Sequence, residues 1–324
     1  MENRVDIKDF VLKIERDFPV NDWKINGIHL WPILRIRLFF FLINTIENQQ
    51  KSLKQKTVIT KKKFLNKVKD KLKSFVDVFY YFYWKSKLPT KEYLFVGSDS
   101  HRVNYRDSRF NRYFDVHTEK EQLGSQSMYF EYASNLDNQY NKSLIYKFNR
   151  ALKGFINLKK TVEISSQNFD SYSVFLEELK GNKLLVEFVE NNTESILLRW
   201  FKRRFGIKIL FFDTILKIID PKEVNVLCYY SEDLCDLIAA SNKLGISTID
   251  MQHGPQTDIH LSYGSWSCVP TDGYDVLPRI FWCWDVYSKE VLDKWISKNS
   301  LYTSRLIGNP WVDYWKSKSN TYKH

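Results

Sequence analysis

The sequence predicts an α/β protein built around a parallel sheet, and three observations support this prediction. After Pro89, short runs of β-branched and aromatic residues alternate with helix-length amphipathic segments. A complete strand–helix–strand unit lies in the second half of the chain. Of the 324 residues 44% are hydrophobic, which is enough for a sizeable buried core. Strands that alternate with helices form parallel sheets with helices on both faces.

The first part of the chain is predicted to be helical. Apolar residues at helical intervals predict a helix over 5–18, which Pro19 ends. A second helix begins at Trp31 and Pro32, where proline suits the first turn, and runs to Ile43. The longest apolar run lies in this helix and is far shorter than the ~20 residues that a membrane-spanning helix needs.

A basic amphipathic helix is expected next. The stretch Lys51–Lys73 holds ten Lys and one Asp, a surplus of nine positive charges in a chain whose formal net charge is +11. Apolar residues recur there at three- and four-residue intervals, namely Phe64, Leu65, Val68, Leu72, Phe75, Val76 and Phe79. An aromatic run over 79–84 follows. Two interpretations stay open: a solvated basic face with aromatic residues in the core, or a helix lying on an anionic membrane surface.

The remaining chain supplies the strands of the predicted sheet. Strands are expected over 93–97, 224–230, 246–251, 280–284 and 304–307. Helices are expected over most of 141–219, between Ser231 and Gly245, and over 286–298. The chain therefore divides into a helical region, 1–88, and an α/β region, 89–324, that ends in a polar tail over 316–324.

Several classes of protein are excluded or disfavoured. Positive charge is concentrated in one stretch, which argues against a nucleic-acid-binding face. The chain contains no G-x-x-x-x-G-K-[ST] and no G-x-G-x-x-G, and it lacks the D-x-D element that holds a divalent ion in many nucleotide-sugar enzymes. We therefore expect no metal and no resident cofactor. Four cysteines without C-x-x-C spacing and a charged N-terminus without an apolar signal segment indicate a cytoplasmic location.

Two polar loops follow predicted strands, and ligands of parallel sheets bind at the carboxyl ends of strands. In the loop 252–255, His253 is the candidate catalytic base, because imidazole titrates near neutral pH. Its neighbours Gln252 and Gly254 are candidates for substrate binding, with Gly254 allowing a sharp turn and close approach. A single histidine at a strand end also fits a purely structural role.

The loop 98–102 supplies the other candidates for substrate binding. Asp99 and His101 are placed to act as an acid–base pair, and Arg102 is suited to bind phosphate or carboxylate. The alternative is a loop whose side chains cap a following helix. A metal site from His101, His117, Asp99 and Asp115 lacks a recognisable ligand spacing. Because both loops follow parallel strands, we expect 98–102 and 252–255 to lie on the same edge of the sheet.

A set of motifs distributed over residues 20–315 completes the pattern. It comprises Trp31-Pro32 with Arg35, the strand and helix led by Pro221, Ile249-Asp-Met-Gln-His-Gly254 with Tyr263, the strand Phe281-Trp-Cys-Trp284, and Leu306-Ile-Gly-Asn-Pro310. Together these resemble bacterial surface-polysaccharide glycosyltransferases of GT-B fold, the capsule-biosynthesis proteins related to the Kdo and glycerophosphate transferases. The Gln-His-Gly and Gly-Asn-Pro elements are the most specific parts.

The resemblance implies a Rossmann-like, acceptor-binding N-terminal lobe of a GT-B enzyme, with His253 as the base that activates the acceptor hydroxyl. It implies a nucleotide-activated sugar as donor and a lipid-linked glycan as acceptor, at the cytoplasmic face of the membrane. In such enzymes Gly-Asn-Pro lies near the crossing into the donor lobe, and only fourteen residues follow Pro310 here. We therefore expect the donor-binding lobe to be absent from this chain and to be carried by a partner chain. The alternative is a non-catalytic module that binds an acceptor or a membrane.

Overall fold

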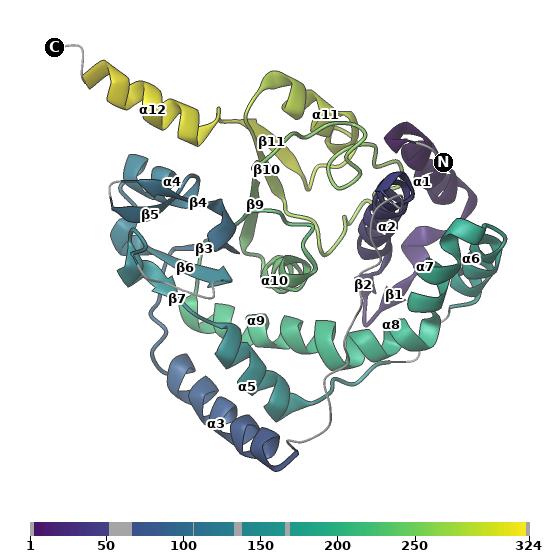
Figure 1. Cartoon of the computed structure of the whole chain (residues 1–324), viewed down its shortest axis with the longest axis horizontal. Helices are drawn as coiled ribbons and strands as arrows, with labels where there is room; N and C mark the ends of the chain where they lie inside the picture. Colours follow the sequence, from purple (N-terminus) through teal and green to yellow (C-terminus); the bar gives the residue numbers. More distant parts are fainter. Residues whose placement is uncertain (1–2, 52–66, 106, 133–137, 166–168, 322–324) are drawn as a thin grey trace.

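A computed structural model of the chain describes residues 3–51, 67–105, 107–132, 138–165 and 169–321 (Figure 1). Its centre is a seven-stranded sheet in which every neighbouring pair of strands is parallel. The strands are β3 (Tyr93–Ser98), β6 (Ser127–Tyr132), β7 (Ile145–Tyr146), β8 (Glu223–Val226), β9 (Ser247–Met251), β10 (Ile280–Cys283) and β11 (Thr303–Leu306). Their order across the sheet is β11-β10-β9-β8-β3-β6-β7. The predicted α/β class with a parallel sheet is confirmed.

The helices and two small hairpins surround this sheet. The helices are α1 (Arg4–Asp17), α2 (Trp31–Lys51), α3 (Lys67–Lys85), α4 (Phe114–Lys120), α5 (Asn149–Lys159), α6 (Asp170–Lys180), α7 (Val186–Asn191), α8 (Glu194–Trp200), α9 (Gly206–Ile219), α10 (Glu232–Lys243), α11 (Val286–Ile296) and α12 (Pro310–Thr321). One hairpin joins β1 (Lys24–Ile25) to β2 (Ile28–His29), and the other joins β4 (Arg102–Tyr105) to β5 (Ser108–Asn111).

Three differences from the sequence-based prediction matter for the site. The strand expected over 224–230 ends at Val226, and the chain turns at Cys228, whose backbone has a left-handed φ of 67°. The hairpin β4–β5, the helix α4 and the strand β6 were not predicted. The expected polar tail is instead largely helix α12, because Asn309 accepts hydrogen bonds from the Trp311 and Val312 amides and Pro310 suits the first turn.

Two hydrophobic clusters cover the two faces of the sheet unequally. The larger cluster packs Val96, Phe130 and Phe281 against helices α2, α5, α9, α10 and α11. The smaller cluster on the other face centres on Phe95 and Trp282, with α4 as its helix. Helix α12 lies beside α4, against the β4–β5 hairpin. Helices therefore lie on both faces, but few cover the second face.

The N-terminal helices belong to the same core as the sheet. Glu15 of α1 accepts a hydrogen bond of 2.8 Å from Arg35 of α2, and both side chains are fully buried. Arg35 donates onward to the Ser265 carbonyl and lies 3.9 Å from the Trp266 ring centroid. This network ties the Trp31-Pro32 helix to the loop between β9 and β10. The boundary expected at residues 88 and 89 therefore does not separate two cores.

Helix α3 has one face in the core and one face in solvent. Tyr81 and Trp84 are buried, whereas the apolar side chains on the other side are between 51% and 71% exposed. Those exposed side chains are Phe75, Val76, Phe79, Phe82 and Tyr83, which we call the α3 outer face. Most of the predicted Lys51–Lys73 helix lies outside the described residues: Lys51 ends α2 and Lys67 begins α3.

Within the described ranges we find no helix whose length and hydropathy would let it cross a bilayer.

Candidate functional site

The two loops chosen from the sequence lie at the same edge of the sheet. Strands β3, β8 and β9 are parallel neighbours, so the residues that follow them emerge on one side. The imidazole rings of His101, after β3, and His253, after β9, have their centroids 5.7 Å apart. The prediction that loops 98–102 and 252–255 meet is confirmed.

At this edge of the sheet lies the position where the order in which the chain adds strands changes direction. From β3 the chain proceeds to β6 and β7 on one side, and it then returns to place β8 on the other side of β3. In open α/β sheets such a reversal separates the loops on either side and leaves room for a ligand at the carboxyl ends. His101 follows β3 and Tyr230 follows β8, so these two residues flank the switch point, and His253, which follows β9, lies against both of them.

Aromatic side chains surround the two histidines. The Tyr230 hydroxyl lies 3.4 Å from His253 Nε2, and the Tyr113 hydroxyl donates to the His253 backbone carbonyl at 3.2 Å. Tyr113 stacks on Trp284 with an interplanar angle of 6°. His260 lies 5.3 Å from the Tyr230 ring, centroid to centroid. We call His101, Tyr113, Tyr230, His253, His260 and Trp284 the switch-point site.

Burial keeps the histidines of this site neutral. Burial, with a smaller contribution from the neighbouring His101, lowers the pKa of His253 to about 4, while the Met251 backbone carbonyl acts in the opposite direction. Burial also lowers the pKa of His260 to about 4 and that of His101 below its ordinary value. At neutral pH the site therefore presents imidazoles that are free to accept a proton.

Gly254 and Gln252 have different roles from those expected. A Cβ on Gly254 would meet no atom, and its φ is not left-handed, so the fold itself does not require glycine there. The open space beside it still permits close approach to the backbone next to His253. Gln252 is buried: its amide donates to the Gly254 carbonyl and to Ser288, and its oxygen accepts from the Trp284 amide. Its amide group is therefore engaged within the protein, where it shapes the loop around His253.

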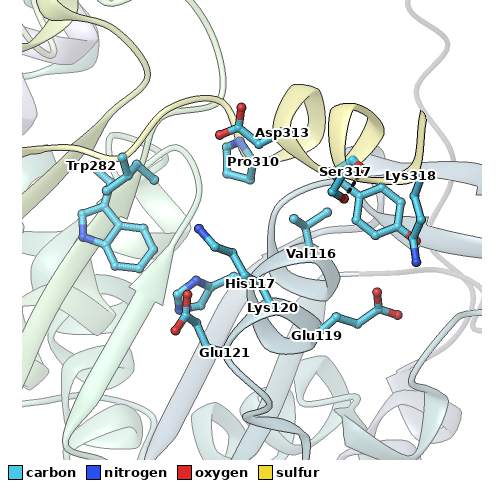
Figure 2. Close-up of a pocket in the computed structure, with 12 residues that line it drawn as sticks. Val116, His117, Glu119, Lys120, Glu121, Trp282, Pro310, Asp313, Ser317 and Lys318 are labelled. Atoms are coloured by element: carbon cyan, nitrogen blue, oxygen red, sulfur yellow. Dashed lines mark hydrogen bonds between the residues drawn. The ribbon is translucent and has the colours of Figure 1, made fainter. Parts of the chain in front are cut away.

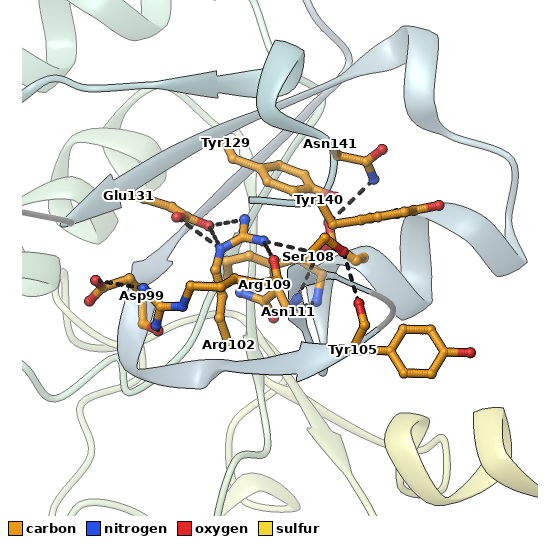
Figure 3. Close-up of polar contacts among 12 residues, drawn as sticks. Asp99, Arg102, Tyr105, Ser108, Arg109, Asn111, Tyr129, Glu131, Tyr140 and Asn141 are labelled. Atoms are coloured by element: carbon orange, nitrogen blue, oxygen red, sulfur yellow. Dashed lines mark hydrogen bonds and ion pairs between the residues drawn. The ribbon is translucent and has the colours of Figure 1, made fainter. Parts of the chain in front are cut away.

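Arg102 is a structural residue, which corrects its assignment to substrate binding (Figure 3). Its side chain is fully buried and donates to Glu131 Oε1 at 2.9 Å and to Asp115 Oδ2 at 3.1 Å. A further N–H donates to the Arg109 carbonyl at 2.8 Å. We call Arg102, Asp115 and Glu131 the Arg102 network. Because the guanidinium N–H groups point into the protein, Arg102 is not accessible to an anionic ligand.

Asp99 is held by the hairpin. Its carboxylate lies 3.6 Å from Arg109 Nη1, and Arg109 Nη2 donates to its backbone carbonyl at 3.1 Å (Figure 3). It is partly exposed and remains near the edge of the sheet, but its partner is Arg109 and not the expected His101. In the described part of the chain no three His, Cys, Asp or Glu side chains form a group that could hold a metal ion.

Sequence reasoning missed four members of the switch-point site. His260 lies in the same loop as His253, seven residues later, so its position was a usable signal. Tyr230 follows β8 and lies at the same edge of the sheet. The predicted strand 224–230 included Tyr230, so the sequence analysis did not place this residue in a loop at that edge. Tyr113 and Trp284 meet only because α4 covers β10 on the second face, and no local pattern predicts that contact.

Comparisons with known proteins add nothing to this geometry. No family model matches the chain, and searches of curated proteins and of solved structures found no match.

Proposed function

We propose that this chain is the acceptor-binding lobe of a GT-B glycosyltransferase and that His253 is its general base. The observation that supports this most strongly is the position of His253: a half-buried, neutral imidazole at the topological switch point, beside open space at Gly254. The motifs Gln252-His253-Gly254 and Gly308-Asn309-Pro310 resemble those of surface-polysaccharide transferases. The donor is a nucleotide-activated sugar or glycerol, and the acceptor is a lipid-linked glycan.

The proposed step balances without a metal ion. With a nucleotide-sugar donor, a hydroxyl oxygen of the acceptor attacks the anomeric carbon, and the bond from that carbon to the phosphate oxygen breaks. With CDP-glycerol, the hydroxyl oxygen attacks the phosphorus that bears glycerol, and the phosphoanhydride bond to CMP breaks. The nucleotide leaves with the bonding electron pair, and His253 takes the hydroxyl proton. The low pKa of His253 means that the imidazole is in its base form before the reaction. A donor diphosphate close by raises that pKa, because an anion stabilises the imidazolium.

The α3 outer face supports a location at the membrane surface. Five apolar or aromatic side chains on one side of α3 are exposed, while Tyr81 and Trp84 on its other side anchor it in the core. Lys73 at the beginning of this face is exposed as well. Aromatic rings with adjacent lysines suit the interface of an anionic bilayer, where lipid-linked acceptors reside.

A transfer assay tests the role of His253. The chain is combined with a partner chain that carries a donor lobe, and the pair is incubated with a panel of nucleotide-activated sugars and CDP-glycerol, and with synthetic lipid-linked disaccharides as acceptors. We expect His253→Ala and His253→Gln to slow transfer by roughly 10²–10⁴, with acceptor affinity nearly unchanged, because a general base acts mainly in the transition state. Thermal unfolding of each variant is the control for folding. Wild-type transfer rates in His253→Ala would refute the proposal.

A second candidate function is favoured by the α3 outer face alone. In this alternative the chain binds acceptor and membrane without catalysis, and a partner chain supplies the donor site. Acceptor binding together with transfer by the reconstituted pair that His253→Ala does not slow would favour this alternative. Slowed transfer in His253→Ala, with acceptor binding unchanged, would exclude it.

Vesicle sedimentation tests the membrane location separately. We expect binding to vesicles with anionic lipid that weakens as salt rises, because Lys residues near an anionic surface contribute on the order of 1 kcal/mol each. Phe75→Ser combined with Phe79→Ser should reduce binding without affecting the fold, since both side chains are exposed. Val174→Ser is the matched control, because Val174 is an exposed apolar residue of α6. Equal binding to neutral and anionic vesicles would contradict this.

A further inference from the structure

A cavity lies beside the switch-point site and has no part in the step above. It has a volume of about 540 Å³, and it opens between α4, β10 and α12 (Figure 2). Ligand pockets span roughly 300–1,000 Å³, so this one is large enough for a ligand of several rings. Trp282 lies at one end of it, and residues of α4 and α12 line its sides.

The Gly-Asn-Pro motif builds the α12 wall of this cavity. Gly308 has a left-handed φ of 77°, which turns the chain away from β11. Asn309 then caps α12 and Pro310 begins it. The carboxylate of Asp313 lies where a side chain on residue 308 would be. The motif therefore fixes the position of Asp313 at the cavity.

The charges of the cavity disfavour an anionic ligand. Its lining includes three carboxylates, of Glu119, Glu121 and Asp313, and two ammonium groups, of Lys120 and Lys318. Burial lowers the pKa of the adjacent His117, so that imidazole adds no positive charge at neutral pH. The lining is thus negative by one charge, which opposes a nucleoside diphosphate. Five charged groups in one cavity also disfavour a purely apolar ligand.

The same groups suit a neutral sugar. Carboxylates accept hydrogen bonds from hydroxyl groups and ammonium groups donate to them, and these charge-assisted bonds are the stronger kind. Trp282 is mostly buried, and the part of its ring that reaches the cavity gives the lining an apolar end against which C–H groups of a pyranose can pack. Glu119 is held in position by a hydrogen bond from the Tyr140 hydroxyl. A wall of fixed polar groups with one aromatic end discriminates well between orientations of a pyranose.

Two ring pairs connect this cavity to His253. Tyr113, which donates to the His253 carbonyl, stacks on Trp284. One turn along α4, about 5.4 Å, His117 contacts Trp282, with ring centroids 4.9 Å apart. Trp282 lies in β10 and Trp284 directly follows that strand, and both pack in the smaller hydrophobic cluster. Two residues of extended chain span about 6.6 Å. This step is comparable to the length of one pyranose unit.

We propose that the cavity binds neutral pyranose units of the acceptor glycan that precede the unit whose hydroxyl lies at His253. This inference rests on the proposed function, because it assigns the cavity to the same acceptor. In this proposal the glycan extends along the aromatic rings from Trp284 to Trp282. Selection among acceptors then depends on the sugar in the cavity as well as on the sugar that reacts.

Equilibrium binding of defined disaccharides tests the proposal. The probes are cellobiose, lactose and N,N′-diacetylchitobiose, with UDP and CMP as the anionic comparison, followed by titration calorimetry and by ligand-observed NMR. We expect at least one disaccharide to bind with millimolar affinity. Asp313→Asn and Lys120→Met should each weaken it by about tenfold, the equivalent of ~1.4 kcal/mol for one charge-assisted hydrogen bond. Both side chains are exposed, so these variants keep the fold.

Two controls make the outcomes distinct. Asp272→Asn changes an exposed carboxylate outside the cavity lining and should leave disaccharide affinity unchanged. His253→Ala should also leave it unchanged. Binding of none of the three disaccharides, binding that Asp313→Asn does not weaken, or UDP binding that Asp313→Asn alters would overturn the cavity proposal. Disaccharide binding together with unimpaired transfer by His253→Ala would instead refute the proposed function and keep the cavity.

Discussion

His101 and Arg102 are neighbours in the chain, yet they belong to two regions of opposite character. Arg102 lies in a closed network in which a guanidinium and two carboxylates satisfy one another without solvent. His101 lies in the switch-point site, among half-buried neutral imidazoles and aromatic rings that face an open position. Both residue types suit catalysis or binding, so burial and partners decide which of them is available for chemistry.

The largest effect that tests this difference is on stability. Arg102→Ala leaves Glu131 and Asp115 buried without their cation, so we expect a loss of about 3–5 kcal/mol in the free energy of unfolding. His101→Ala should cost at most about 1 kcal/mol, because it removes a half-buried loop side chain. Urea denaturation of the two variants measures both values.

Arg305→Ala is the control for the Arg102 variant, because it removes an exposed arginine. An Arg102→Ala protein as stable as Arg305→Ala would mean that the Arg102 network is not structural. In that case Arg102 would return to the list of substrate-binding candidates.

A smaller effect appears in the acid stability of the switch-point site. The pKa of His253 and of His260 is about 4 in the folded chain, below the value of ~6.5 of an unfolded chain. The folded state therefore binds fewer protons in this window, and the free energy of unfolding falls as the pH is lowered from about 6.5 to about 4.

The variants His253→Gln and His260→Gln should each make this fall less steep. Urea denaturation at a series of pH values across the window measures the slope. Unchanged slopes in both variants would show that the fold does not lower the pKa of these imidazoles, which contradicts the burial effect described for the switch-point site.

The smallest effect has the opposite sign and belongs to the Arg102 network. Burial raises the pKa of Asp115 to about 6 in spite of the opposing charge of Arg102. The folded state binds more protons than the unfolded state here, so this carboxyl lowers stability as the pH rises from about 4 to about 6. Asp115→Asn should therefore cost less stability above pH ~6 than near pH ~4. An equal cost at both pH values would contradict this.

The sequence predicted those parts of the fold that depend on local pattern. Strand β9 is a run of alternating apolar residues between Gly245 and the loop of His253, and the rule that parallel strands share an edge then predicted that His253 meets His101. The burial of Arg102 could not be predicted in this way. Its partners Asp115 and Glu131 lie 13 and 29 residues further along the chain, on elements that only the folded sheet brings together.

The aromatic run over 79–84 is a second case in which local sequence could not predict burial. Its composition fitted both a buried helix and a surface helix, and the helix turns out to contain both. Tyr81 and Trp84 enter the core, while Phe79, Phe82 and Tyr83 remain exposed. The choice between the two faces is made by contact with α5, which begins 64 residues after Lys85 and cannot be read from the run itself.

Gly154 of α5 allows α3 and α5 to pack very closely. A Cβ there would collide with the backbone carbonyl of Asp77, so the backbones of the two helices are in contact. Beside that point, Lys153 and Arg150 of α5 form ion pairs with the Asp77 carboxylate. Helix α3 is the outermost helix on its side of the molecule and has no freedom to roll about its own axis (Figure 1). A bilayer that binds the α3 outer face would therefore hold the whole sheet at one tilt. The fold would then fix the distance between His253 and the lipid surface, and the acceptor glycan would have to be long enough to span that distance.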